Sequence, residues 1–260
     1  MEIKKILERL ARGELSIPTA EQELRLYSIE YVEKNLAKID PLREFRSGKP
    51  EVILAQGKEI QDLIKIIIAT ISRKKFAVVS KVSPAYMKAI SNESEKQNLK
   101  IYKGINTILI SRKSHRFDKR NGKIGVLCAG TSDIKIAEEV NIMAKVMGSQ
   151  TIVEYDVGIS GIHRTLNAIT NMVNSKVHVI VVIAGMEGAL ASFVSSVIDI
   201  PVIGVPTSVG YGYGSDGIAA LTSMLQTCSM GMAVVNIDNG IGAGVFASMM
   251  ANKMSAASEK

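Results

Sequence analysis

Five short segments rich in glycine and small polar residues follow apolar runs in the second half of the chain. They are AGTSD (129–133), DVGISGIHR (156–164), AGMEG (184–188), PTSVGYGYGSDG (206–217) and NIDNGIGAG (236–244). Glycine lets a backbone approach a ligand closely, and the free N–H groups at the start of a helix attract phosphate. Five such segments in register predict a nucleotide or phosphate site where they meet.

A few side chains in these segments could act on a nucleotide or hold it. Glu187 stands at a predicted helix start, where it either complements the helix dipole or serves as a general acid or base. His163 can exchange protons near neutral pH, and the neighbouring Arg164 can pair with phosphate. Ser132 and Asp133 are both typical N-caps. One of them suffices as a cap, which leaves the other side chain for a ribose or a phosphate.

The chain has two cysteines, Cys128 and Cys228. Two cysteines do not make the disulfide framework of a small secreted domain, so a reduced, cytoplasmic setting is expected. Cys128 falls within a predicted buried strand. Cys228 falls near the end of a predicted helix, 216–231, among methionines and alanines, where a free cysteine usually serves as a small apolar side chain.

The elements that must position these residues alternate regularly from Lys123 onward. The predicted strands are nearly uniformly apolar, which suits parallel strands covered by helices on both faces. Such repeats fold as a doubly wound sheet that binds its ligands at the carboxyl ends of the strands. The predicted strands are 123–129, 151–157, 177–184, 201–206 and 233–237, and the predicted helices are 132–148, 160–175, 187–198 and 216–231.

The first half of the chain predicts a smaller α/β unit behind a helical lead-in. Apolar residues three and four apart indicate two lead-in helices, at 2–15 and 19–28. The charged stretch 111–123 interrupts the pattern of strands and helices and is the expected boundary, so that residues 1–120 form one domain and 121–260 the other. Between them we predict strands at 51–56, 76–82 and 106–111 and helices at 57–75 and 83–99.

The charge of the chain is unevenly distributed. The net charge is +7, yet no Lys or Arg occurs between 177 and 251. Aromatic residues make up 5% and Trp is absent, so the basic half lacks the stacking side chains of a nucleic-acid surface, and no nucleic-acid partner is expected. The apolar runs are broken before they reach the roughly 18 residues of a membrane span, so no membrane partner is expected either.

The same motifs carry a family resemblance. Together with LQTCSMGMAVVNIDNGIGAG (225–244), and with IDPLREFRSGKPEVILAQGKE (39–59) in the first half, they resemble the LarB family, the pyridinium-3,5-biscarboxylic acid mononucleotide synthases. The resemblance covers most of residues 39–252. Its second half is also similar to the carboxylase and mutase that act on aminoimidazole ribonucleotide, through Ser132 and Asp133, His163 and Arg164, and PVIGVP (201–206). Glu187 and Cys228 depart from those two enzymes.

The LarB resemblance implies a specific reaction. Nicotinic acid adenine dinucleotide is carboxylated at carbon 5 of its pyridinium ring, and its phosphoanhydride is hydrolysed to release AMP. Cys228 is then the nucleophile, Glu187 the base, and His163 a carboxylate ligand or proton shuttle. Carbon dioxide or bicarbonate is the co-substrate, and Mg²⁺ is expected for the hydrolysis without a dedicated set of protein ligands. The residues expected to bind substrate are Gly130, Thr131, Ser132, Asp133, Arg164, Gly185, Met186, Gly188, Thr207, Ser208 and Asp238.

Two other functions remain open from the sequence. An aminoimidazole ribonucleotide carboxylase or mutase would keep the fold without needing a thiol. A nucleotide-sensing module would bind a dinucleotide without turning it over. In each case the apolar second half suggests helices buried between subunits, so a homo-oligomer is expected.

Overall fold

The computed structural model describes residues 2–26, 30–32, 36–40 and 43–258. The chain divides into two compact units, residues 1–102 with 108–115 and residues 103–107 with 116–260. The last crossing of the chain from the first unit to the second, between His115 and Arg116, falls inside the charged stretch 111–123. The short segment 103–107 is part of the second unit, which the sequence did not indicate.

The first unit begins with two helices, α1 (Glu2–Ala11) and α2 (Ile17–Leu26), which pack together and are joined by an ion pair between Arg9 and Glu23. α1 lies within the helix predicted at 2–15. α2 overlaps the helix predicted at 19–28 but begins two residues earlier, and residues 27 and 28 fall outside the described part. An antiparallel pair, β1 (Glu30–Val32) and β2 (Ala37–Ile39), and the short α3 (Arg43–Ser47) follow. None of these three elements was expected from the sequence.

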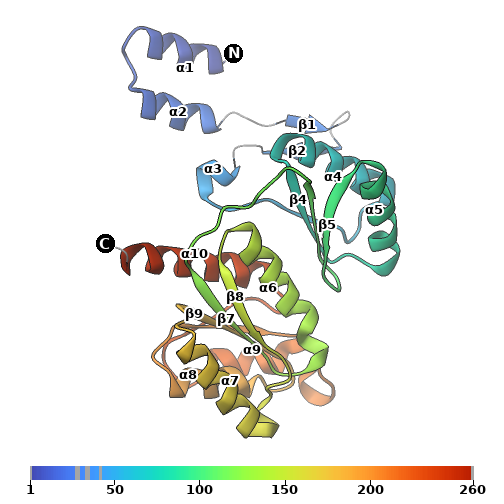
Figure 1. The fold of residues 1–260 in the computed structure, drawn as a ribbon, viewed down its shortest axis with the longest axis vertical. Helices are drawn as coiled ribbons and strands as arrows, with labels where there is room; N and C mark the ends of the chain where they lie inside the picture. Colours follow the sequence, from blue (N-terminus) through green and yellow to red (C-terminus); the bar gives the residue numbers. More distant parts are fainter. Residues whose placement is uncertain (1, 27–29, 33–35, 41–42, 259–260) are drawn as a thin grey trace. The chain divides into compact units, whose positions relative to one another are not determined.

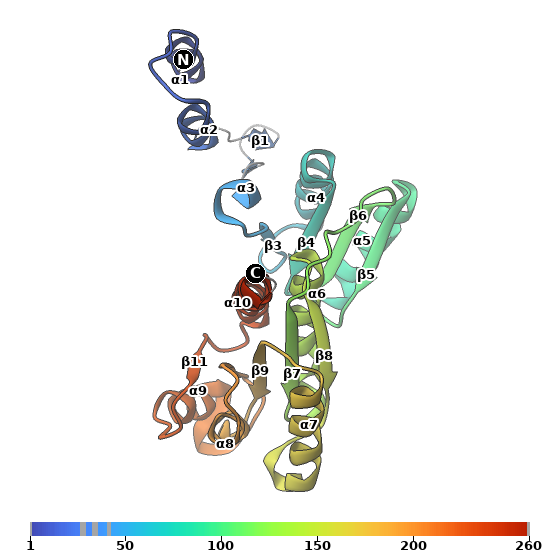
Figure 2. The same ribbon diagram turned by 60° about the vertical axis from the view of Figure 1, so that its left-hand side comes forward.

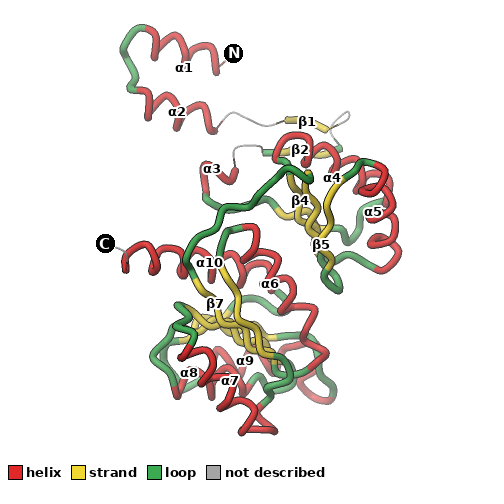
Figure 3. The backbone as a smooth tube through the Cα atoms, in the orientation of Figure 1, coloured by secondary structure: helices red, strands yellow, loops and turns green. Residues whose placement is uncertain are grey.

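The core of the first unit is a four-stranded mixed sheet in the order β3-β4-β6-β5, and Figure 3 draws its strands in yellow. β3 runs parallel to β4, and β4 runs antiparallel to β6. Their apolar side chains pack with those of two helices into one hydrophobic cluster. The elements are β3 (Val52–Leu54), α4 (Ile60–Lys74), β4 (Phe76–Ser80), α5 (Pro84–Lys96), β5 (Leu99–Lys103) and β6 (Ile108–Arg112).

Strand β5 corrects the prediction of a helix over 83–99. The helix ends at Lys96, and the chain turns at Asn98, whose φ is +54°. Leu99 and Ile101 then alternate with the exposed Lys100, so that one face of the strand packs on the cluster. The alternation of period two was visible in the sequence, but the apolar residues were too few to outweigh the helical pattern before them.

The second unit is built on five parallel strands in the order β11-β10-β9-β7-β8, of which Figure 1 labels β9, β7 and β8. When the strands are numbered 1 to 5 along the chain from β7 and the sheet is read from β8 to β11, the order is 2-1-3-4-5. This is the order of a doubly wound α/β fold, which confirms the predicted fold class. The strands are β7 (Lys123–Cys128), β8 (Gln150–Glu154), β9 (Val179–Ala184), β10 (Val202–Pro206) and β11 (Met232–Val234).

Helices cover both faces of this sheet, as the uniformly apolar strands require. Val126 and Val181 point to one face, where α6 (Ile134–Val146) and α10 (Gly240–Ser258) pack side by side (Figure 2). Leu127 and Val182 point to the other face. That face is covered by α7 (Ile162–Asn174), α8 (Ala189–Val197) and α9 (Ile218–Leu225).

Helix α10 was not predicted, and it corrects the reading of 236–244 as a turn, because its first residues are helical from Gly240. Small residues form its buried stripe, so its sequence has almost no amphipathic contrast. A Cβ added to Gly244 would lie 2.8 Å from Cβ of Met143. The small residues therefore allow the close approach of α10 to α6. Among the described helices, none is long and apolar enough to cross a bilayer.

Candidate active site

The order of the strands places a crevice at the carboxyl ends of β7 and β9. These strands are neighbours, and the chain leaves them toward opposite faces of the sheet, which is where doubly wound folds bind ligands. A cavity of about 310 Å³ opens there. Its lining is Ala129, Gly130, Ser132, Asp133, Gly158, Ile159, Ser160, Ala184, Gly185, Met186, Glu187, Ala189, Leu190 and Val209.

The segment after β7 contributes a buried carboxyl group and an exposed hydroxyl group. A short 3-10 helix, Thr131–Asp133, leads into α6 and buries Asp133. Oδ1 of Asp133 accepts a hydrogen bond of 2.6 Å from Thr207, and Oδ2 accepts one of 3.2 Å from the N–H of Gly130. Burial raises the pKa of Asp133, and these two hydrogen bonds oppose part of the rise. Ser132 is exposed and lines the cavity, so its hydroxyl can reach a ligand there.

A raised carboxyl pKa at a cavity is typical of groups that transfer protons. From the sequence, Asp133 was expected either to cap the helix or to bind substrate. In the structure both of its oxygens accept hydrogen bonds from the protein, and its pKa is raised. The sequence could not show this, because the shift comes from burial and from Thr207, which lies 74 positions away.

The turn between β9 and α8 is closely packed against the segment after β10. A Cβ added to Gly185 would lie 2.2 Å from the carbonyl oxygen of Val209, and that oxygen accepts a hydrogen bond from the N–H of Met186. Met186 has a φ of +49° and Gly188, the N-cap of α8, a φ of +67°. Left-handed conformations at a non-glycine residue often mark functional turns. Glu187 sits between these two residues with its side chain exposed at the cavity.

The segment after β8 contributes a residue that the sequence analysis missed. Ser160 lies in a short 3-10 helix, Ile159–Gly161, and lines the cavity. Gly158 brings this segment close to β7, since a Cβ there would lie 2.9 Å from the carbonyl oxygen of Ala129. A serine between two glycines in GISG was the available signal for Ser160.

His163 and Arg164 lie in the first turn of α7, outside the lining of the cavity. The imidazole of His163 is exposed. Arg164 is ion-paired with Asp156, and its guanidinium lies over Gly161. A phosphate bound by Arg164 would therefore have to compete with the carboxylate of Asp156. The roles expected for His163 and Arg164 stay predictions.

Hydrogen bonds link the loops that follow β10 and β11 to each other and to the segment after β7. The residues that make them are Thr207, Ser208 and Asp238. Thr207 is fully buried. Asp238 accepts hydrogen bonds from the N–H of Ser208 at 3.0 Å and from its hydroxyl at 2.6 Å. The N–H of Asp238 donates to the carbonyl oxygen of Pro206. These three residues fix the loops around the cavity rather than line it.

The cavity thus brings together only part of the predicted site. The predicted residues in its lining are Gly130, Ser132, Asp133, Gly185, Met186 and Glu187. The predicted residues outside the lining are Thr131, His163, Arg164, Gly188, Thr207, Ser208, Asp238 and Cys228. The binding roles of both groups of residues stay predictions.

Cys228 and Glu187 lie at opposite ends of the strands of the sheet: Cys228 precedes the start of β11, and Glu187 follows the end of β9. The sequence predicted that Cys228 lies in a helix. Helix α9 ends at Leu225, however, so Cys228 lies in the loop before β11. Met232, the first residue of β11, pairs with Val202, the first residue of β10. Glu187 instead follows Ala184, which pairs with the last residue of β10. Five residues of strand span about 15 Å, so the two side chains of one chain do not meet.

The two cysteines differ in their access to solvent. Cys228 is exposed and free. Cys128 is buried at the end of β7, and burial, with the neighbouring Asp133 as a lesser cause, raises the pKa of its thiol to about 12. Because the thiolate is the nucleophilic form, burial disfavours Cys128 as a nucleophile, whereas the thiol of Cys228 is accessible to solvent.

The described residues offer Mg²⁺ little more than single carboxylates. No three His, Cys, Asp or Glu side chains converge in this part of the chain. The oxygens of Asp133 already accept hydrogen bonds, whereas Glu187 is exposed at the cavity. An ion held here would take its remaining ligands from phosphate and water, a common arrangement for Mg²⁺.

Comparison with known proteins extends over both units. Residues 123–260 match the AIR carboxylase family, and residues 31–112 match the LarB/PurE-like N-terminal domain. An uncharacterized protein of Methanocaldococcus jannaschii is 43% identical over 257 residues, which are 97% of this chain and 98% of that protein.

Two further similarities are confined to about half of the chain. The N5-carboxyaminoimidazole ribonucleotide mutase of the same organism is 35% identical over 126 residues, 48% of this chain and 75% of that protein. The crystal structure of a Treponema denticola PurE2 variant aligns with 54% of this chain and 96% of its own, at 18% identity and a TM-score of 0.38. On the match over 123–260, the chain belongs to the AIR carboxylase family, with a LarB/PurE-like N-terminal domain before the family domain.

Proposed function

We propose that this chain carboxylates nicotinic acid adenine dinucleotide at carbon 5 of its pyridinium ring and hydrolyses the phosphoanhydride. The products are pyridinium-3,5-biscarboxylic acid mononucleotide and AMP, the first step of nickel-pincer cofactor biosynthesis. One observation carries the proposal. A LarB/PurE-like N-terminal domain precedes an AIR carboxylase domain in which Glu187 lines the cavity and Cys228 is exposed.

The electron-poor ring must first be made nucleophilic. The thiolate of Cys228 adds to carbon 4, and the electron pair displaced through the ring neutralises the ring nitrogen. Carbon 5 is now the nucleophilic end of an enamine and forms a bond to carbon dioxide, which leaves an iminium between the ring nitrogen and carbon 6. Loss of the proton on carbon 5 restores the enamine. Expulsion of the thiolate from carbon 4 then restores the aromatic pyridinium.

Glu187 is the residue we assign to remove the proton from carbon 5. It is the exposed carboxylate of the cavity, and the turn that carries it is fixed by the contact of Gly185 with Val209. A base must come within hydrogen-bond reach of the proton it removes, so a carboxylate on a rigid turn is well suited to this role. Asp133 lines the same cavity, and we assign to it the onward transfer of this proton. His163 lies outside the lining of the cavity, so it would bind only a substrate carboxylate that extends beyond the cavity.

Cys228 and Glu187 of a single chain cannot both reach one pyridinium ring, because they lie at opposite ends of the strands. The mechanism therefore requires the thiol of a second copy of the chain. The surface around Cys228 suits such a contact. Met230 is 91% exposed and Leu225 is 65% exposed, and both are apolar side chains that a partner would bury. The homo-oligomer expected from the sequence is thus a requirement of the proposed chemistry.

Hydrolysis of the anhydride needs charge compensation for the phosphates. Mg²⁺, when bound, would neutralise charge on the phosphate oxygens. The protein supplies N–H groups at the starts of α6 and α8, the hydroxyls of Ser132 and Ser160, and Arg164 if the anhydride displaces Asp156. These groups would orient the anhydride for attack by water on the phosphorus of the AMP half.

A second candidate follows from the mutase of Methanocaldococcus jannaschii, which is 35% identical over much of the second unit. Its name places it in aminoimidazole ribonucleotide chemistry. In that case the same cavity would hold a ribonucleotide whose ring carbon is already nucleophilic. No thiol would then be needed, which makes Cys228 the residue that separates the two candidates.

The test is to incubate the purified protein with nicotinic acid adenine dinucleotide, bicarbonate and Mg²⁺ and to analyse the small molecules by mass spectrometry. A parallel reaction contains aminoimidazole ribonucleotide instead, to which carboxylation would add the mass of carbon dioxide. The proposal predicts AMP and the dicarboxylated mononucleotide in the first reaction and unchanged substrate in the second. Turnover in the second reaction alone would establish the second candidate, and turnover in neither would overturn both.

A further inference from the structure

Two tyrosine side chains extend into solvent from the segment between β10 and α9. Tyr211 is 81% exposed, and Tyr213 is 109% exposed, as in a fully extended chain. Large aromatic side chains are usually buried, and exposed apolar groups that lie close together often mark a binding surface. Exposed aromatic rings are also the surfaces on which proteins stack nucleobases. We therefore consider the two rings as a surface for a base.

The segment that carries these rings is fixed at both ends and open in the middle. At its start, the carbonyl oxygen of Val209 accepts a hydrogen bond of 2.9 Å from the N–H of Met186, which precedes Glu187 in the turn after β9. At its far end, a Cβ added to Gly214 would lie 2.1 Å from a side chain of α9. Gly212, between the two tyrosines, has a φ of +79°, and a Cβ added there would meet nothing within 4 Å. The fixed ends thus present both rings to solvent.

The start of this segment belongs to the cavity of the second unit, because Val209 is part of its lining. Tyr211 follows two residues later, so its Cα lies within about 7 Å of the Cα of Val209. A tyrosine side chain has a comparable length. The ring of Tyr211 can therefore reach the mouth of the cavity, whereas Tyr213 is a further two residues along the chain.

The cavity itself has room for only one half of a dinucleotide. Its volume of about 310 Å³ is at the lower end of small-molecule sites, which have about 300–1,000 Å³. A dinucleotide consists of two nucleosides and two phosphates. The proposed reaction needs the pyridinium ring at Glu187, in the lining of the cavity. The adenosine half would then lie outside the cavity, where it needs a surface of its own.

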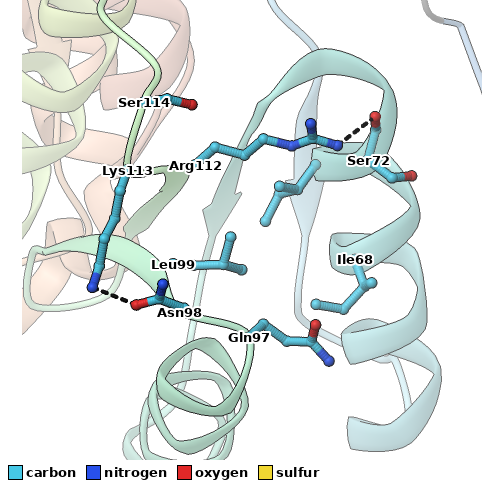
Figure 4. A pocket seen from close by; sticks show the side chains of 9 residues that line it. Ile68, Ser72, Gln97, Asn98, Leu99, Arg112, Lys113 and Ser114 are labelled. Carbon is cyan, nitrogen blue, oxygen red and sulfur yellow. Dashed lines mark hydrogen bonds between the residues drawn. The ribbon is translucent and has the colours of Figure 1, made fainter.

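A cavity of about 450 Å³ in the first unit does not offer a second nucleotide site (Figure 4). Its two cations are bonded on different sides. Nη2 of Arg112 donates to the carbonyl oxygen of Ser72 at 3.0 Å, and Nζ of Lys113 donates to Oδ1 of Asn98. Because these two cations do not converge, they form no joint site for a phosphate.

We propose that Tyr211 binds the adenine of the dinucleotide by stacking, an inference that rests on the proposed function because that function supplies the dinucleotide. The adenine lies against the face of the phenol ring at the mouth of the cavity, while the pyridinium ring lies inside, at Glu187. The stack contributes to binding of the substrate and not to the chemistry at carbon 5. It favours a dinucleotide over the corresponding mononucleotide, so Tyr211 determines the specificity for the substrate.

The test combines Tyr211→Ala with truncation of the ligand. Isothermal titration calorimetry, without bicarbonate or Mg²⁺, measures the binding of nicotinic acid adenine dinucleotide and of nicotinic acid mononucleotide. Tyr211→Ala should weaken binding of the dinucleotide about tenfold, as is typical for the loss of one base stack, and leave binding of the mononucleotide unchanged. Tyr211→Phe keeps the ring and should bind both ligands as the wild type does. Tyr213→Ala is the matched control, since it removes an exposed ring further from the cavity.

The stacking would be overturned if Tyr211→Ala weakened the binding of both ligands equally, or of neither, even where the wild type carboxylates the dinucleotide. Dissociation of an oligomer by Tyr211→Ala, with equal effects on both ligands, would overturn it too and would place the ring against a second copy. A dinucleotide that binds in the predicted pattern without being carboxylated would support the stacking and contradict the proposed reaction. A dinucleotide that the wild type neither binds nor carboxylates would overturn both.

Discussion

Thr207 and Asp133 are joined by a hydrogen bond of 2.6 Å between their side chains. Thr207 follows β10 and Asp133 precedes α6 after β7, so the bond passes over the end of β9, which lies between the two strands. Both residues are buried. Together they form one polar unit at the wall of the cavity, and the turn that carries Glu187 is held next to it.

Replacing Thr207 by valine tests whether this bond stabilises the fold. The substitution keeps the shape of the side chain but leaves an oxygen of the buried Asp133 without its donor, which typically costs about 1–3 kcal/mol of unfolding free energy. Urea denaturation measures the loss. The control is Thr222→Val on α9, where the threonine is exposed and donates only within its own helix. Equal losses of unfolding free energy in the two variants would show that the hydrogen bond to Asp133 adds no stability beyond that of the helix-internal bond of Thr222.

The pH dependence of stability reports on Asp133. Burial, the largest cause, raises its pKa in the folded protein above the ordinary value of 3.8. The folded chain therefore binds the proton more tightly than the unfolded chain does. The resulting stabilisation is fully present below the ordinary pKa and is lost as pH rises through the folded pKa.

Asp133→Asn removes this titration. The unfolding free energy of the wild type minus that of the variant should therefore fall as pH rises above 3.8 and become constant above the folded pKa. Urea denaturation over a pH series gives this difference. Asp199→Asn, at an exposed position, is the control. A difference that stays constant, or increases with pH, would contradict the burial argument.

The sequence was sufficient for the second unit's sheet, because five uniformly apolar runs separated by helical segments allow few other folds. It also located the turn around Glu187 correctly. It failed for α10, whose contact with α6 depends on Gly244 and neighbouring small residues and leaves no amphipathic pattern. It failed for Cys228 as well, because methionine and alanine continue a helical pattern past Leu225, where α9 ends.

Long-range contacts were also beyond the sequence. The raised pKa of Asp133 depends on burial and on a distant threonine. The separation of Cys228 from Glu187 depends on the register of β10 with β9 and β11. Neither follows from local spacing, and both bear directly on the proposed chemistry.

Mixing two inactive variants tests the requirement for a second copy. Cys228→Ala and Glu187→Gln should each abolish carboxylation. Exchange of subunits between them should restore about a quarter of wild-type activity, because random pairing in a two-fold dimer leaves one complete site in half of the dimers. Product formation after dissociation and reassembly measures the recovery. Mass spectrometry of the intact oligomers confirms that mixing occurred, and mixed oligomers without activity would show that the thiol does not act from a second copy.

The most direct test of the account follows label from bicarbonate into the pyridinium product. Wild-type protein and Cys228→Ser are incubated with nicotinic acid adenine dinucleotide, Mg²⁺ and isotopically labelled bicarbonate, and the product is quantified by mass spectrometry. The account predicts one labelled carboxylate per product molecule with the wild type and no labelled product with Cys228→Ser, although the variant remains folded. Incorporation by Cys228→Ser at the wild-type rate would contradict it.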